Sequence, residues 1–221
     1  MRIDGKTHWN RVFQNDQVVI HVVRDSRAAS VVVDVMDGHR PGIWVSDLYG
    51  ARQGHADLWQ VCLAHQPRDR EYAIEAGDAI FAPRMKMLLL RAVVPARRRK
   101  SLSDSTRRTC LRRLDREMIA IMGLAPTNRH GKRSRKRYGK ARNELFTFLE
   151  HPDVPPDNNG GERELRPTTT YRKVTGGFRS KWGADLCANV RSVIGTAQRR
   201  GIDAFQAIVR VLRGQPVLRP G

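Results

Sequence analysis

Acidic residues are scarce in this chain of 221 residues: 22 Asp and Glu stand against 41 Lys and Arg, and the formal net charge at pH 7 is +19. Such an excess of one sign opposes a compact state unless a polyanion is the partner, and nucleic acid is the usual polyanion. An acidic membrane surface is the other candidate. The composition therefore favours a protein that contacts nucleic acid.

Long apolar runs are missing as well. No stretch of 18 consecutive apolar residues occurs, which excludes an ordinary membrane-spanning helix and weakens the membrane interpretation. The first ten residues contain Arg2, Asp4, Lys6 and His8 and lack the apolar segment of a secretory signal peptide. We therefore expect a cytoplasmic protein.

Cysteine is rare and widely spaced, at Cys62, Cys110 and Cys187, and no Cys-x-x-Cys pair is present. This argues against a disulfide framework and against a structural zinc site. Cys62 and His65 have a spacing that zinc ligands use, but we favour the simpler explanation that they mark a strand end followed by a helix start. Aromatic residues make up only 6% of the chain, which argues against a single-stranded RNA reader that stacks bases on aromatic side chains.

The periodicity of apolar residues changes along the chain from strand-like to helical. Residues 8–14 and 18–23 flank a short polar turn and predict a β-hairpin. The stripe Tyr138, Ala141, Leu145 and Phe148 has the spacing of one helical face. Leu186, Val190, Val193 and Ala197 repeat that spacing in a later helix. Further predicted elements are a helix over 28–36, strands over 43–46 and 58–64, helices over 68–75, 82–99 and from Asp104, and a last helix capped by Asp203.

Positive charge is concentrated in residues 91–142, which hold 18 Lys and Arg against 3 Asp and Glu, a net charge of +15. One interpretation is a solvated helix face. We favour a surface that faces a polyanion, because so few acids cannot neutralise so many cations.

The stretch from Asp153 to Ala184 is the least ordinary part of the sequence. Pro155 and Pro156 end the preceding secondary-structure element, and the polar residues 157–159 can cap a new helix. Glu162 falls near the first turn of that helix. Six cations surround this carboxylate, namely Arg163, Arg166, Arg172, Lys173, Arg179 and Lys181. The group is either a surface salt-bridge cluster or a metal-binding carboxylate on a surface that holds phosphates.

A second carboxylate, Asp47, follows the apolar run Ile43–Ser46, at the strand end where ligands of α/β sheets tend to lie. A strand-end Asp and a helix Glu can together bind Mg²⁺, which takes one or two carboxylates plus water and phosphate oxygens. With two such ions, one activates the attacking oxygen of a phosphodiester reaction and the other stabilises the leaving oxygen.

Four segments in order resemble successive motifs of one family: residues 45–50 (VSDLYG), 62–65 (CLAH), 158–167 (NNGGERELRP) and 172–180 (RKVTGGFRS). The family is the bacterial insertion-sequence transposases of family 66, and the resemblance covers nearly the whole chain. It implies a ribonuclease H-like catalytic domain of the DDE type, with an Asp-Asp-Glu triad that binds Mg²⁺ or Mn²⁺ and catalyses DNA cleavage and strand transfer. Asp47 matches the second acid of that triad and Glu162 the third.

The resemblance also implies the fold class and the organisation. We expect an α/β protein with a ribonuclease H-like mixed sheet in residues 1–66, a basic helical insertion in 67–152, and the third-acid helix with C-terminal helices in 153–221. The implied partners are insertion-sequence ends and target DNA, bound by a homo-oligomer at the nucleoid, with the six cations around Glu162 on the DNA.

Two departures from the family pattern concern the acids. The first Asp of the family lies in an Asp-Glu-Thr motif, and residues 1–5 look like the residues just after it. Asp4 is a poor replacement for that Asp, because it is followed by the turn-forming Gly5. Gly161 stands where the family usually has Ala. We therefore expect an N-terminally truncated transposase with little or no DNA cleavage of its own. The alternative is a non-catalytic DNA-binding remnant, or a regulator of an intact transposase.

Overall fold

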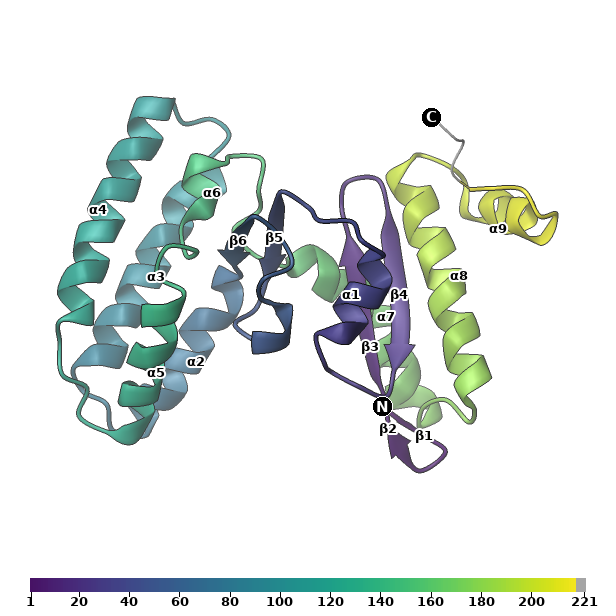
Figure 1. Cartoon of the computed structure of the whole chain (residues 1–221), viewed down its shortest axis with the longest axis horizontal. Coiled ribbons are helices and arrows are strands. Elements are labelled where there is room, and N and C mark those ends of the chain that lie inside the picture. The colour runs from purple at the N-terminus through teal and green to yellow at the C-terminus, as the bar shows by residue number, and fades with distance from the viewer. Residues whose placement is uncertain (218–221) are drawn as a thin grey trace. The chain divides into compact units, whose positions relative to one another are not determined.

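The computed structural model describes residues 1–217, which divide into two compact units (Figure 1). Unit 1 combines residues 1–31 with 159–221, and unit 2 is the intervening stretch 32–158. The boundaries thus fall at 31/32 and 158/159, whereas the sequence predicted limits at 66/67 and 152/153. The predicted division assigns roles to segments, namely a sheet, a basic insertion and helices that complete the core. The boundaries of the compact units do not test these roles, so the division stays a prediction. Each unit is described by itself below.

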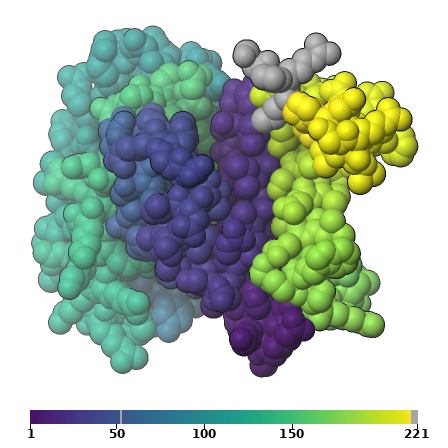
Figure 2. Space-filling model, turned by 45° about the vertical axis from the view of Figure 1, so that its right-hand side comes forward, coloured from purple at the N-terminus to yellow at the C-terminus, as the bar shows by residue number. Residues whose placement is uncertain are grey.

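Unit 1 is built on the predicted β-hairpin. Strands β3 (Trp9–Gln14) and β4 (Val19–Arg24) pair antiparallel, with Phe13 opposite Ile20, and a two-residue pair β1 (Arg2–Ile3) and β2 (Lys6–Thr7) precedes them. Helix α8 (Lys181–Arg199) packs along β4 and α7 (Asn159–Thr175) along β3. Figure 2 shows the hairpin in purple beside α8 in yellow-green. The short α9 (Ala204–Leu212) follows and packs on α8.

Close packing of α8 on β4 depends on a glycine. A Cβ placed on Gly195 would lie 3.1 Å from Cγ2 of Val19, so any larger residue would push helix and strand apart. The Thr196 hydroxyl then reaches the strand: it accepts a hydrogen bond from Val19 N at 3.1 Å and donates one to Val19 O at 3.2 Å. The apolar core of this unit is small, with Ile3, Val23, Ala184 and Ala188 buried.

Unit 2 combines a short parallel strand pair with a helical bundle. Strands β5 (Ile43–Ser46) and β6 (Leu58–Val61) run parallel, with Ser46 opposite Val61. The helices of the bundle are α2 (Gln66–Glu75), α3 (Phe81–Arg98), α4 (Asp104–Met122), α5 (Arg129–Lys140) and α6 (Thr147–Glu150). Helix α1 (Ser30–Met36) spans the boundary between the units, and 3₁₀ turns cover Gly50–Arg52 and Leu63–His65.

A large apolar core holds unit 2 together. Its members include Phe81, Met85, Leu88 and Leu89 of α3 with Leu114, Met118 and Ile121 of α4, and none of them is more than 6% exposed. The helix predicted to start at Asp104 is confirmed, because α4 begins at that residue. The N-caps also follow the sequence, because the side chains of Ser103 and Asn128 accept hydrogen bonds from the first turns of α4 and α5.

Three local predictions were wrong. The stripe from Tyr138 to Phe148 is not one helix, because α5 ends at Lys140 and α6 begins only at Thr147, although all four stripe residues are buried in one core. The strand predicted over 58–64 ends at Val61. On α8 the buried side is formed by Ala184, Ala188 and Ala197, while Leu186 is 46% and Val190 37% exposed.

The mixed α/β class is confirmed, because helices combine with both parallel and antiparallel strand pairs. The described strands form three separate two-stranded sheets. Within the described part of the chain, no helix combines the length and the apolar character that crossing a membrane requires.

Candidate metal and DNA-binding site

Asp47 lies in unit 2, directly after β5, at the carboxyl end of the parallel pair. It is half-buried, and its Oδ1 accepts a hydrogen bond from the backbone N–H of Tyr49 at 3.0 Å. The preceding strand end is held firmly, since Cys62 N donates to Ser46 O at 2.7 Å and Trp59 Nε1 donates to Ser46 Oγ at 2.9 Å. The backbone that carries the Asp47 carboxylate is therefore well anchored.

The second motif lies beside the first at this strand end. Cys62 is fully buried after β6, and its Sγ is 3.3 Å from Nδ1 of His65. The same sulfur accepts a hydrogen bond from the backbone N–H of Asn158 at 3.2 Å. The first two motifs and Asn158, the first residue of the third, thus meet within unit 2, and Asn158 is 96 residues from Cys62 in sequence.

Burial raises the pKa of the Cys62 thiol, more than the nearby backbone hydrogen bonds lower it. The sulfur is therefore a neutral thiol that accepts a hydrogen bond, and a zinc ligand would need to be a thiolate. Cys62 directly follows strand β6, and His65 is the last residue of a 3₁₀ turn. This is the arrangement that the simpler of the two explanations predicts.

Glu162 lies in unit 1, in the first turn of α7. The two predicted metal ligands therefore belong to different units. Among residues 1–217, no group of three or more His, Cys, Asp and Glu side chains assembles that could hold a metal ion alone.

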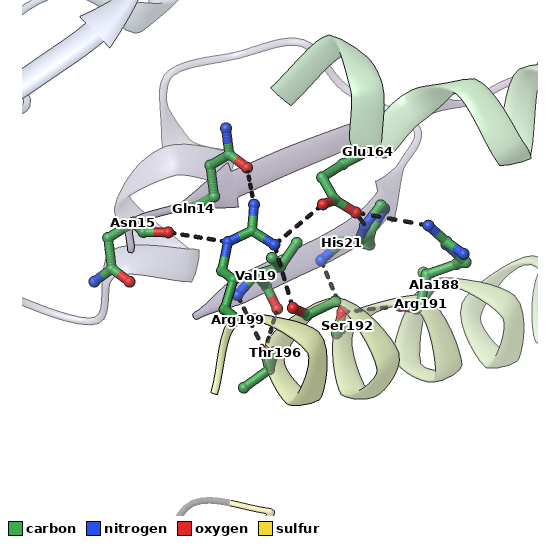
Figure 3. Close-up of polar contacts among 11 residues, drawn as sticks. Gln14, Asn15, Val19, His21, Glu164, Ala188, Arg191, Ser192, Thr196 and Arg199 are labelled. Atoms are coloured by element: carbon green, nitrogen blue, oxygen red, sulfur yellow. Dashed lines mark hydrogen bonds and ion pairs between the residues drawn. The ribbon is translucent and has the colours of Figure 1, made fainter. Parts of the chain in front are cut away.

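A second acid on the same helix, Glu164, serves the fold of unit 1 (Figure 3). Its Oε1 accepts a hydrogen bond from Arg199 Nη1 at 3.1 Å, and its Oε2 lies 3.6 Å from Arg191 Nη2 and 3.7 Å from His21 Nε2. Arg199 also donates to the Gln14 side chain and, at 3.1 Å, to Asn15 O. Glu164 thereby joins α7, α8 and the hairpin.

His21 is buried in this cluster at 2% exposure. Desolvation lowers its pKa, although Glu164 acts in the opposite direction, and Arg191 and Arg199 lower it further. The ring is therefore neutral near pH 7. Sequence reasoning missed this cluster, yet a signal was present: Val19, His21 and Val23 alternate along β4, which places His21 on the buried face.

The six cations predicted to bind DNA all belong to unit 1 but do not share one environment. Arg166 and Lys173 lie four and eleven residues after Glu162, so helical periodicity places them on the same side of α7 as Glu162. Arg172 is near the N-terminus instead: burial lowers the pKa of the Met1 amino group, and Arg172 lowers it further.

Only one of the six is neutralised locally. Lys181 forms an ion pair with Asp185 one turn later in α8. Within the described residues, Arg163, Arg166, Arg172, Lys173 and Arg179 make no hydrogen bond or ion pair, and all five are exposed. Cations without protein partners are available for phosphates.

Comparison with known proteins bears on this arrangement. The sequence profile described as "Transposase IS66 family" matches residues 1–186, which include Asp47, Glu162 and the six cations. The uncharacterized protein y4jO of Sinorhizobium fredii (strain NBRC 101917 / NGR234) is 32% identical over 66 residues. That match covers 30% of this chain and about a fifth of the relative, 21% of its length. No solved structure matches the chain.

Proposed function

The chain belongs to the IS66 family of transposases, and from that premise we propose that it acts on DNA in the transposition of an insertion sequence. The observation that carries the proposal is the family match over residues 1–186, which contains both candidate acids and the surrounding cations. The proposed partners are the ends of the element and its target DNA, bound by an oligomer of the chain at the bacterial nucleoid. The proposed core is ribonuclease H-like, with a mixed sheet.

We propose that Asp47 and Glu162 hold the divalent metal of a DDE-type site. Their chemistry fits Mg²⁺ or Mn²⁺, which prefer hard oxygen ligands and need only one or two carboxylates beside water and phosphate oxygens. The complete family site is expected to take two ions, which supply Lewis-acid activation of a phosphodiester. The roles of the chain itself are to bind the metal through the two acids and to hold the DNA backbone through the exposed cations of unit 1.

The choice of Glu162 over Glu164 rests on the family motif, in which Glu162 matches the third acid. Glu164 accepts a hydrogen bond from Arg199 and lies within ion-pair distance of Arg191 and His21. Its carboxylate oxygens therefore stabilise the fold of unit 1. Chain connectivity supports the pairing with Asp47. Asn158 is bonded to Cys62 beside the end of β5, and Glu162 follows four residues later, a span of at most about 14 Å.

Mn²⁺ binding to the full chain tests this assignment. Asp47→Asn and Glu162→Gln should each weaken binding at least about tenfold, because each removes one of two carboxylate ligands. Asp153→Asn, a change at an exposed carboxylate, is the matched control and should leave binding unchanged. Equal binding by wild type and Glu162→Gln would remove Glu162 from the site.

Nicking of element-end DNA, measured in parallel, separates two functions. Robust metal-dependent nicking that Glu162→Gln abolishes would show that the ligands within these 221 residues suffice for catalysis. DNA binding without nicking favours the second candidate, a non-catalytic DNA-binding protein or regulator of an active transposase. The observation in favour of this candidate is that no three-ligand metal group assembles among the described residues, whereas exposed cations are plentiful.

A further inference from the structure

Helix α5 of unit 2 is an unusual helix by charge. Its 12 residues, Arg129–Lys140, include seven Lys and Arg and no acid. Like charges four residues apart, as at Lys132 and Lys136 or Lys136 and Lys140, each destabilise a helix by about 0.2–0.5 kcal/mol. The sequence of α5 alone therefore disfavours the helix, and contacts with the rest of unit 2 must hold it.

Those contacts lie on the opposite side of α5. Tyr138 is fully buried, donates its hydroxyl to Gln66 Oε1 at 3.1 Å, and has the Arg70 guanidinium 4.8 Å from its ring centroid. Arg70 also donates to Ser134 Oγ. At the start of the helix, Gly131 is so close to the Asp78 carboxylate that a Cβ there would clash with it. The inner face is thus fixed, which makes α5 a rigid support for its outer face.

The outer face is exposed and cationic. We define the α5 basic face as the five exposed cations Arg129, Lys132, Arg133, Lys136 and Lys140. A shallow groove of about 350 Å³ opens beside it, lined by Met122 and Pro126 together with Lys132, Arg135, Lys136 and Gly139. Figure 1 shows α5 as one rod of the bundle in unit 2.

The cations of this face lack acidic partners, unlike many other cations of unit 2. Within residues 1–217, the side chains of Lys132, Arg133, Lys136 and Lys140 make no hydrogen bond or ion pair, and the side chain of Arg129 donates to that of His130. Six acids of unit 2 pair with other cations, as Arg40–Asp57, Lys86–Glu71, Arg91–Glu117, Lys100–Asp153, Arg107–Asp104 and Arg137–Asp69.

We propose that the α5 basic face binds the sugar–phosphate backbone of duplex DNA without reading its sequence. The proposal rests on the proposed function only in taking DNA as the partner, and it adds a contact in unit 2 to the motif cations of unit 1. A helix of 12 residues is about 18 Å long, and duplex DNA carries about ten phosphate charges over that length. A rigid row of cations on one face can therefore meet several phosphates at once.

The side chains present decide among kinds of nucleic acid. The face has no Asn or Gln, which would read adenine in the major groove, and it is dominated by Lys, which acts as a point charge on phosphate. It also has no aromatic residue on which unpaired bases could stack, as single-strand readers require. The three Lys among the five cations therefore favour contact with the backbone of a duplex.

The test is duplex binding by the full chain as a function of salt. A random-sequence labelled duplex is titrated with wild type and with the triple variant Lys132→Gln, Lys136→Gln, Lys140→Gln. Loss of three phosphate contacts should reduce the slope of log Kobs against log salt by about 2.7 and the affinity at about 0.1 M salt by roughly two orders of magnitude. The matching Lys→Arg triple variant should bind like wild type, because it keeps the charges.

The control is a triple variant with the same net charge, Arg40→Gln, Lys86→Gln, Lys100→Gln, whose cations are paired with Asp57, Glu71 and Asp153. It should keep the wild-type slope. Equal losses in both triple variants would overturn the proposal, since total charge would then explain binding. Tighter binding of the wild type to a structured RNA hairpin than to the duplex would overturn the choice of DNA. If the Gln triple variant fails to fold, Lys136→Gln alone should lower the slope by about 0.9.

The outcomes are separate from those of the metal test. The Gln triple variant should keep wild-type Mn²⁺ binding, and Glu162→Gln should keep the wild-type salt slope. An unchanged slope in the triple variant of α5 together with intact metal binding would reject the α5 contact alone. A reduced slope in a protein that binds no metal would reject the proposed catalytic site alone.

Discussion

Unit 2 is held together by a large apolar core, whereas unit 1 combines a small apolar core with an ionic cluster that joins its helices to the hairpin. Phe81, Leu88, Leu89 and Phe148 of unit 2 are fully buried in one large cluster. The apolar core of unit 1 has four members, and its helices are joined to the hairpin by His21 and Glu164 with two arginines. An apolar core is insensitive to pH and salt, while an ionic cluster responds to both.

The same contrast governs which charges remain for a ligand. In unit 1, Arg191 and Arg199 hold the fold together, so a count of its cations overestimates what DNA could contact. In unit 2 the core carries the fold, and the cations of α5 are left without partners. Net charge in the sequence therefore says less about DNA binding than the pairing of each cation does.

Truncation in the core of unit 2 should have the largest effect. Leu88→Ala leaves a cavity in a fully buried site and should lower the free energy of unfolding by about 2–5 kcal/mol. Leu90→Ala on the same helix is the matched control, because Leu90 is 43% exposed, and its cost should be about 1 kcal/mol or less. Urea unfolding followed by hydrogen exchange of α3 measures both. Similar costs would show that this core does not dominate unit 2.

Removal of Glu164, the central acid of the ionic cluster in unit 1, should have the second-largest effect on stability. Glu164→Gln leaves Arg199, Arg191 and His21 without a carboxylate, and because the Glu164 side chain is 15% exposed we expect about 2 kcal/mol rather than the full cost of a broken buried pair. Glu162→Gln, in the same helix, should cost less than about 1 kcal/mol, the size of a helix-dipole contribution. Hydrogen exchange of α8 distinguishes the two. Equal destabilisation would mean that the ionic cluster does not hold unit 1.

Acid should affect unit 1 before unit 2. The folded pKa of His21 lies below its unfolded value of about 6.5, so its stabilising effect is complete above that pH and is lost as the pH falls through the folded pKa. In unit 2 burial alone would raise the pKa of Asp78, but hydrogen bonds from the backbone of Thr127, Ile80, Phe81 and Ala82 outweigh it and lower the pKa. The contribution of Asp78 is therefore present above about pH 3.9 and is lost only below it.

Hydrogen exchange of α8 and α3 at a series of pH values tests this order. Protection of α8 should begin to fall below about pH 6.5, while protection of α3 should persist to much lower pH. His21→Gln should remove the mildly acidic phase from α8 without changing α3. Loss of protection in both helices at the same pH would contradict the contrast between the units.

The smallest effect should come from the α5 basic face. The triple variant Lys132→Gln, Lys136→Gln, Lys140→Gln should raise stability by about 0.4–1 kcal/mol, because two repulsive pairs are removed. Thermal unfolding at low salt measures this. A marked loss of stability would mean that these lysines serve the fold, and it would weaken their assignment to DNA.

Local features followed from the sequence because they depend on neighbouring residues. Alternation over residues 9–24 produced the hairpin, and Ser103 and Asp203 cap α4 and α9 through their own side chains. The family motifs and the basic character of residues 91–142 were also readable there, because they are properties of composition and order. These determined the family, the class of partner and the candidate acids.

Tertiary structure decided what depends on residues far apart in the chain. Periodicity predicted one helix from Tyr138 to Phe148. In the structure, two helices separated by a turn contribute these residues to the same buried core. For the same reason, periodicity did not reveal the role of Glu164, because its partners His21 and Arg199 come from β4 and α8. Burial is set by whichever distant element packs against a side chain, as when Thr196 meets Val19 across 177 residues, and spacing within one helix carries no information about that.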